Sequence, residues 1–111
     1  MLKIDYIELL SGDMKATQDF LTQAFGWSFQ DYGPTYQAFA DAGIDGGIDG
    51  SGEGATGVPL VILKTDDLEA ALQQVTDAGA EITQAIFSFP GGRRFQFREP
   101  GGNEMGVWSE S

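Results

Sequence analysis

A chain of 111 residues, 41% of them hydrophobic, is long enough for one folded domain with a modest core. The net charge of −11 argues against nucleic-acid binding. No apolar run is long enough to span a bilayer, so we expect neither a nucleic acid nor a membrane as a partner. Without histidine or cysteine, triads that need either side chain are excluded, and acid–base chemistry would fall to carboxylates, tyrosine or lysine. The absence of cysteine and of a signal-peptide pattern predicts a cytoplasmic protein.

The first half of the chain predicts a strand, a helix and three more strands. Apolar residues recur every three or four positions after Asp13, which favours a helix opened by that residue and closed by Gly26. The predicted ranges are a strand at 3–10, a helix at 14–25, and strands near 27–32, 36–40 and 44–49.

The second half repeats this order. Asp66 and Asp67 open a predicted helix whose buried stripe is Leu68, Ala71, Leu72 and Val75, and Gly79 closes it. A strand at 60–65 precedes the helix, and strands near 81–84, 94–98 and 104–108 follow.

Matching residues indicate an internal duplication. The pairs are Asp13 and Asp66, Gly26 and Gly79, Tyr36-Gln37 and Phe95-Gln96, and Gly47-Ile48 and Gly106-Val107. The first two pairs are 53 residues apart and the last two are 59 apart, so the second half has six extra residues, expected within 88–93.

The segment 43–57 is rich in glycine. A phosphate-binding loop would need Lys-Ser/Thr after its glycines, and Asp45, Asp49 and Glu53 would repel an anion. We therefore predict a single domain, 1–111, in which a flexible linker at about 50–57 joins a module at about 1–50 to another at about 58–111.

Three segments resemble the vicinal oxygen chelate superfamily, which comprises glyoxalase, bleomycin resistance and dioxygenase proteins. They are Ile4-Asp5-Tyr6-Ile7-Glu8-Leu9, Ala24-Phe25-Gly26-Trp27, and Glu99-Pro100-Gly101-Gly102-Asn103-Glu104, which is similar to the family's Asp-Pro-x-Gly-Asn turn. The resemblance implies an α+β fold in which paired βαβββ modules form an open, cup-shaped mixed β-barrel with the helices outside. It also implies a ligand inside the cup and a homodimer.

Metal-dependent members of that family hold their metal on the first and last strands of each module. The resemblance places these four positions at Tyr6, Gly47, Leu60 and Gly106. Glycine and leucine offer no side-chain ligand, so we predict neither the family metal nor any other cofactor.

Strand alternation extends the set of residues that would face the cup. If Tyr6 and Gly106 point inward, Glu8, Glu104 and Trp108 do so too. The candidate ligand-binding residues are Tyr6, Glu8, Asp45, Leu60, Glu104, Trp108 and Arg98, and no catalytic residue is assigned. In the alternative interpretation the aromatic residues fill the barrel and the glutamates lie at its wet rim.

The arginines at 93, 94 and 98 also allow two interpretations. They form either a gate for a carboxylate or phosphate group, or part of an edge strand where they pair with the surplus acids.

The predicted function is metal-free binding of a small organic ligand, cationic or aromatic. A lyase or dioxygenase of the same superfamily, and a metal-independent enzyme that uses the carboxylates of the cup, remain alternatives. A ferredoxin-like dimeric barrel remains an alternative fold.

Overall fold

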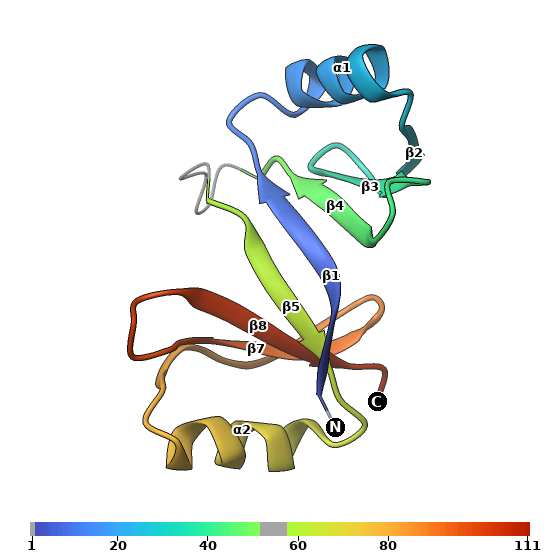
Figure 1. Ribbon diagram of the computed structural model, residues 1–111. Helices are drawn as coiled ribbons and strands as arrows, with labels where there is room; N and C mark the ends of the chain where they lie inside the picture. The colour runs from blue at the N-terminus through green and yellow to red at the C-terminus, as the bar shows by residue number, and fades with distance from the viewer. Residues whose placement is uncertain (1, 52–57) are drawn as a thin grey trace. The chain divides into compact units, whose positions relative to one another are not determined.

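The computed structural model describes residues 2–51 and 58–111 and shows an α+β protein (Figure 1). Most of the predicted linker, residues 52–57, lies outside the described residues. In chain order the elements are β1 (Lys3–Leu10), α1 (Met14–Phe25), β2 (Ser28–Asp31), β3 (Tyr36–Ala40), β4 (Asp45–Asp49), β5 (Leu60–Lys64), α2 (Leu68–Asp77), β6 (Glu81–Phe89), β7 (Gly92–Arg98) and β8 (Glu104–Ser109). The βαβββ order therefore occurs twice, as predicted.

The chain divides into two compact units, and the first spans Tyr6–Leu60. Its strands are ordered β2-β3-β4-β1, with β1 parallel to β4 and β3 antiparallel to both of its neighbours. Helix α1 contacts β4. Leu21 of the helix and Phe39 and Ile48 of the sheet are buried, so this unit has apolar residues at its centre.

The second unit consists of Met1–Asp5 and Val61–Ser111. Its strands are ordered β5-β8-β7-β6, with β5 parallel to β8 and the other pairs antiparallel. Helix α2 lies along β7 and β8 (Figure 1). Its core contains Leu68 and Ala71 of the helix and Phe95, Phe97 and Val107 of the sheet.

Both helices begin at an aspartate, as the sequence predicts, but the second begins one residue later than the repeat implies. The Asp13 carboxylate accepts a hydrogen bond from Ala16 N at 3.1 Å, and Asp67, not Asp66, accepts from Ala70 N at 3.0 Å. The two caps are thus 54 residues apart, so the match of Asp13 to Asp66 is wrong by one residue.

The proposed match of Tyr36 to Phe95 is also wrong by one residue. Ala38 lies opposite Gly47 in the first unit, and Gln96 lies opposite Gly106 in the second. Tyr36 is therefore equivalent to Arg94. A one-residue change of register moves a side chain to the other face of a sheet. The similarity of Tyr36-Gln37 to Phe95-Gln96 therefore gave an alignment that is one residue out of register.

Strand β6 is longer than predicted, because it continues past Gln84 to Phe89. Its pairing with β7 is irregular between Ile82 and Gln84 and again between Gln84 and Phe87. Such irregularities break the alternation that identifies a strand in sequence, which explains why only its first four residues were predicted.

Candidate functional site

The strands of each unit have one face toward the helix of that unit and an opposite face, called here the inner face. In the second unit, Phe95 and Val107 pack against α2, so alternation places their neighbours Gln96, Gly106 and Trp108 on the inner face. The predicted orientation of these β8 residues agrees with this packing.

In the first unit, two tyrosines and a glutamate form a hydrogen-bonded triad on the inner face. Tyr36 Oη donates to Glu8 Oε2 at 3.1 Å, and the hydroxyls of Tyr6 and Tyr36 are hydrogen-bonded to each other. Since Tyr36 donates its hydrogen to Glu8, Tyr6 donates to Tyr36. Only 4% of Glu8 is exposed, and its buried carboxylate accepts the hydrogen bond from Tyr36.

Gly47 makes room for this triad. A Cβ built on Gly47 would lie 2.5 Å from Tyr36 Oη and 2.6 Å from two ring carbons. At Gly47 the ring of Tyr36 therefore occupies the space that the missing side chain leaves. At Gly106 a Cβ would meet its nearest atom, Ile62 Cγ1, at 3.5 Å, which is ordinary contact.

The surroundings of Tyr36 keep its hydroxyl protonated. Burial raises the pKa of Tyr36 far above its usual range, and the negative charge of Glu8 and the hydrogen bond with Tyr6 raise it further. Tyr36 therefore acts as a hydrogen-bond donor and not as a phenolate.

A polar network crosses the inner face of the second unit. Glu104 Oε2 accepts hydrogen bonds from Thr83 Oγ1 at 2.7 Å and Gln96 Nε2 at 3.1 Å. Gln96 Oε1 in turn accepts from Arg94 Nη2 at 3.0 Å, and the Arg94 guanidinium lies 5.3 Å from the centre of the Phe87 ring. The network orients a carboxylate and a guanidinium on one surface.

Trp108 lies among charged and aromatic neighbours in the same unit. Its indole Nε1 donates to Asp5 Oδ1 at 3.2 Å, and Lys64 Nζ lies 4.9 Å from the ring centre. The ring of Phe89 lies 6.1 Å away. The indole thus already makes a cation–π contact, which is the chemistry expected for a cationic ligand.

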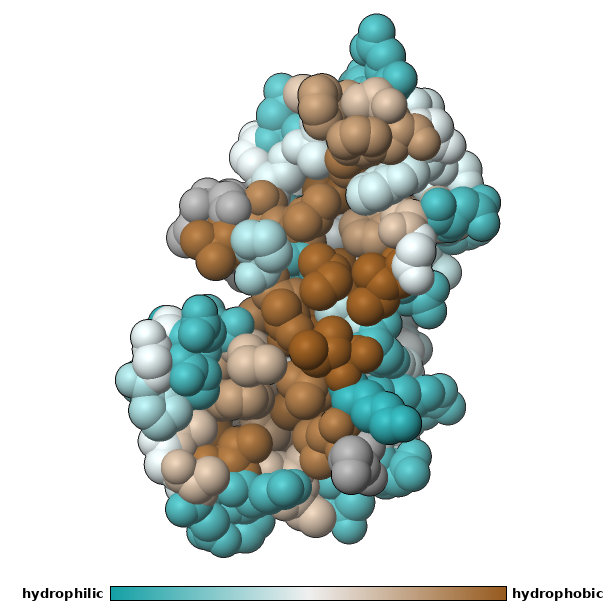
Figure 2. All heavy atoms as spheres, viewed as in Figure 1, coloured by the Kyte–Doolittle hydropathy of each residue, from teal (hydrophilic) through white to brown (hydrophobic). Residues whose placement is uncertain are grey.

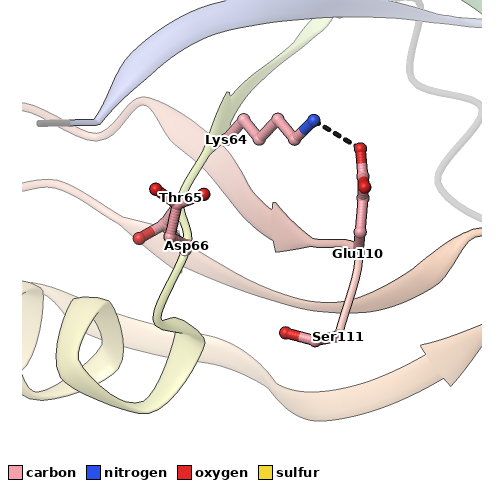
Figure 3. A pocket seen from close by; sticks show the side chains of 5 residues that line it. All are labelled: Lys64, Thr65, Asp66, Glu110 and Ser111. Carbon is pink, nitrogen blue, oxygen red and sulfur yellow. Dashed lines mark hydrogen bonds and ion pairs between the residues drawn. The ribbon is translucent and has the colours of Figure 1, made fainter.

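A small pocket of about 250 Å³ adjoins this lysine (Figure 3). It is lined by Lys64, Thr65, Asp66, Glu110 and Ser111, none of which the sequence singled out for binding. Lys64 Nζ and Glu110 Oε1 are 2.6 Å apart, and this contact raises the pKa of Lys64 and lowers that of Glu110. Both groups therefore stay charged.

The three arginines of β7 have different surroundings. Arg93 pairs with Glu69 of α2 at 2.6 Å, and Arg98 pairs with Glu81 of β6 at 3.3 Å. Arg94 lies on the inner face with Gln96. Strand β7 has a neighbour on each side, so the prediction of an edge strand is wrong, although two of the arginines do pair with acids.

The predicted site residues fall into separate groups. Tyr6 and Glu8 meet in the triad, Glu104 and Trp108 share the inner face of the second unit, and Arg98 lies opposite Glu104 in the β7–β8 register. Asp45 lies opposite Tyr6 and is exposed, whereas Leu60 is buried.

The sequence missed four residues that complete these groups, namely Tyr36, Thr83, Gln96 and Asp5. Gly47 was the available signal for Tyr36, because a strand glycine often has an aromatic ring from the neighbouring strand across it.

Two properties of the described residues bear on the chemistry of the site. Within residues 2–51 and 58–111, no three or more acidic, histidine or cysteine side chains are grouped so that they could hold a metal ion. No helix in that part of the chain is long and apolar enough to cross a membrane.

Comparison with known sequences gives one family and two curated relatives. The model of the Glyoxalase/Bleomycin resistance protein/Dioxygenase superfamily matches residues 3–107. The proteins named "Putative glyoxylase CFP32" of Mycobacterium tuberculosis and Mycobacterium bovis are each 25% identical over 115 residues. The match covers 94% of this chain but 44% of theirs, so the chain spans less than half the length of these relatives.

Solved structures share the fold over almost the whole chain. A glyoxalase/bleomycin resistance protein/dioxygenase superfamily member from Vibrio splendidus has a TM-score of 0.72 at 20% identity, covering 98% of both chains. The Mn(II)-bound glyoxalase of Novosphingobium aromaticivorans has a TM-score of 0.70 at 20% identity, covering 97% of this chain and 38% of that one. The methylmalonyl-CoA epimerase of Mycobacterium tuberculosis has a TM-score of 0.72 at 12% identity, covering 97% and 87%.

Proposed function

Because the chain belongs to the glyoxalase/bleomycin resistance protein/dioxygenase superfamily, we propose that it binds a small cationic or aromatic organic ligand on its inner faces, without the family metal. The polar character of these faces carries the proposal. Glu8 and Gln96 are both buried there, whereas the core between α2 and its strands contains a cluster of buried apolar side chains. Burying polar groups opposes folding unless each is hydrogen-bonded, so such a face suits recognition better than packing.

The residues at the family's metal positions do not suit a metal ion. Gly47 has no side chain, and the space beside it holds the ring of Tyr36. Leu60 is a buried hydrocarbon, and Gly106 has no donor. Tyr6 remains, but its hydroxyl is bonded to Tyr36. This donor set supports metal-free binding.

The surroundings of Trp108 suggest the chemistry of the ligand. The indole ring is 4.9 Å from the Lys64 ammonium, so a ligand cation could take the place of that group. An aromatic ligand would instead stack among the rings of Trp108, Phe89 and Phe87. The negative charge of the chain would further raise the local concentration of a cation.

A thermal-shift screen with cationic and aromatic compounds tests the proposal. A ligand of the folded protein raises its melting temperature by an amount that grows with ligand concentration. The two tryptophans then locate the site. In the Trp27→Phe variant Trp108 is the remaining tryptophan, and the ligand should change its fluorescence. In the Trp108→Phe variant the ligand should no longer change the tryptophan fluorescence. Failure of the whole library to stabilise the protein would refute the proposal.

Metal analysis separates this function from a metal-dependent lyase or dioxygenase. Protein purified without chelator should contain less than about one tenth of an equivalent of nickel, zinc, iron or manganese, because the residues that the structure describes offer no suitable ligand set. A stoichiometric amount of any of them would favour the metal-dependent alternative.

The position of Glu104 favours one further candidate, a metal-independent enzyme. Thr83 and Gln96 fix this carboxylate on the inner face, as a positioned general base requires. The Glu104→Gln variant should then lose turnover while keeping ligand affinity, whereas Glu69→Gln, on helix α2 in the exposed pair with Arg93, should change neither. Equal losses of affinity and turnover would mean that Glu104 contributes to ligand binding and not to the chemical step.

A further inference from the structure

Helix α1 exposes two phenylalanines that the first unit does not bury. Phe20 is 61% exposed and Phe25 is 60% exposed. Their rings meet edge to face at 6.0 Å, and Phe25 lies 5.6 Å from Trp27, which follows the helix. These three residues form a continuous surface, called here the α1 aromatic face. Figure 2 shows apolar atoms gathered over this helix.

The fold itself does not require these aromatic residues, as the equivalent helix of the second unit shows. Phe20 is the seventh residue after the cap Asp13, and Gln74 is the seventh after Asp67. Phe25 precedes the left-handed Gly26, as Ala78 precedes the left-handed Gly79. Gln74 and Ala78 are exposed as well, so one helix carries large aromatic rings where the other carries a polar and a small side chain. Exposed aromatic clusters of this kind are typical of protein contacts.

Charge indicates which partner this face suits. The chain has a net charge of −11, which disfavours an anionic membrane or a nucleic acid. Helix α1 is neutral, because its two charged residues, Lys15 and Asp19, pair at 3.1 Å. Helix α2 has two acidic residues and no basic one. Two copies of this acidic chain would therefore meet with less repulsion through α1 than through α2.

We infer that the α1 aromatic face is the contact between two copies of this chain. A contact about a two-fold axis uses the same patch on both copies, which a neutral aromatic surface permits without a complementary charge. The inference gives the expected homodimer a defined surface and does not depend on the proposed ligand.

Sedimentation velocity of the protein from about 1 to about 100 µM tests this inference. The wild-type chain should sediment as a dimer of the 11.9 kDa protomer. The double variant Phe20→Gln and Phe25→Ala has, at these two positions, the residue types of Gln74 and Ala78 in the second unit. It should weaken dimerisation at least about tenfold, because aromatic contacts dominate such interfaces. Its circular dichroism should remain that of the wild type.

Two controls make the result specific. Tyr32→Gln removes another aromatic residue of the first unit, 67% exposed and outside the α1 aromatic face, and should leave the dimer unchanged. Added salt should not weaken the dimer, because an apolar contact persists when the repulsion between acidic chains is screened. A wild-type protein that is monomeric at the highest concentration, or a double variant as dimeric as the wild type, would overturn the inference.

Discussion

The ring of Tyr36 lies over Gly47, so close that a Cβ at position 47 would be 2.5 Å from the phenolic oxygen. Gly47 is one of the positions where the family resemblance places a metal ligand. In this chain the position has lost its side chain, and the neighbouring strand supplies a tyrosine that hydrogen-bonds to Glu8. A polar triad thus fills the space beside a position where the resemblance places a metal ligand.

Replacing Gly47 by alanine should destabilise the protein. The new methyl group would overlap the Tyr36 ring, and relieving such overpacking in a filled site costs about 1–3 kcal/mol. The matched control is Gly106→Ala, whose methyl group would meet no atom closer than 3.5 Å and should change stability little. Urea denaturation measures both. Equal stability of the two variants would mean that the ring can move away from Gly47 without penalty.

Replacing Tyr36 by phenylalanine should also be destabilising. The ring remains, but the buried Glu8 carboxylate and the Tyr6 hydroxyl each lose a partner. Loss of a hydrogen bond to a buried charged group costs about 1–3 kcal/mol. The control is Tyr32→Phe, at a tyrosine that is 67% exposed, which should be neutral. An unchanged denaturation midpoint for Tyr36→Phe would show that the triad contributes nothing to stability.

The raised pKa of Tyr36 predicts that stability declines at alkaline pH. Above pH 10.0, the usual pKa of tyrosine, the unfolded chain releases this proton while the folded chain retains it. The unfolded state then binds fewer protons, so the contribution of Tyr36 is complete below this pH and is lost as the pH rises toward the folded-state pKa. In this range the free energy of unfolding falls by up to about 1.4 kcal/mol for each pH unit.

Denaturation curves between about pH 8 and 11 would measure this decline, and Tyr36→Phe should remove it. A variant that declines as steeply as the wild type would assign the effect to other groups.

Loss of either helix cap should have a similar effect in both units. Asp13→Ala and Asp67→Ala each remove a carboxylate that accepts a backbone N–H, at a cost of about 0.5–2 kcal/mol. Asp66→Ala is the matched control, because Asp66 precedes the cap and should tolerate the change. Thermal unfolding distinguishes the three variants. A larger loss of stability in Asp66→Ala than in Asp67→Ala would mean that Asp66 is the cap and that its match to Asp13 is correct.

Much of the fold could be predicted because local signals agree with the tertiary structure. The first helix, with its cap Asp13 and its closing Gly26, has the predicted bounds, and so do β1 and β3. Strand β6 was predicted too short, because two irregularities in its pairing interrupt the alternation on which the prediction depended.

The candidate site was harder to predict, because hydrogen bonds between distant residues leave no local pattern. Alternation placed Glu104 and Trp108 on one face, but nothing in the spacing showed that Thr83 and Asp5 would bond to them. The same limit applied to Tyr36, whose similarity to Phe95 suggested the opposite face until the strand register was known.

The sequence by itself determined the duplicated βαβββ order, the termini of the first helix and the residue types at the family's metal positions, because these follow from spacing, capping chemistry and side-chain identity. Only the tertiary structure decided that Tyr36 fills the space over Gly47 and that Phe20 and Phe25 stay exposed. Each of these depends on strand register or on packing between residues distant in sequence, which local patterns do not specify.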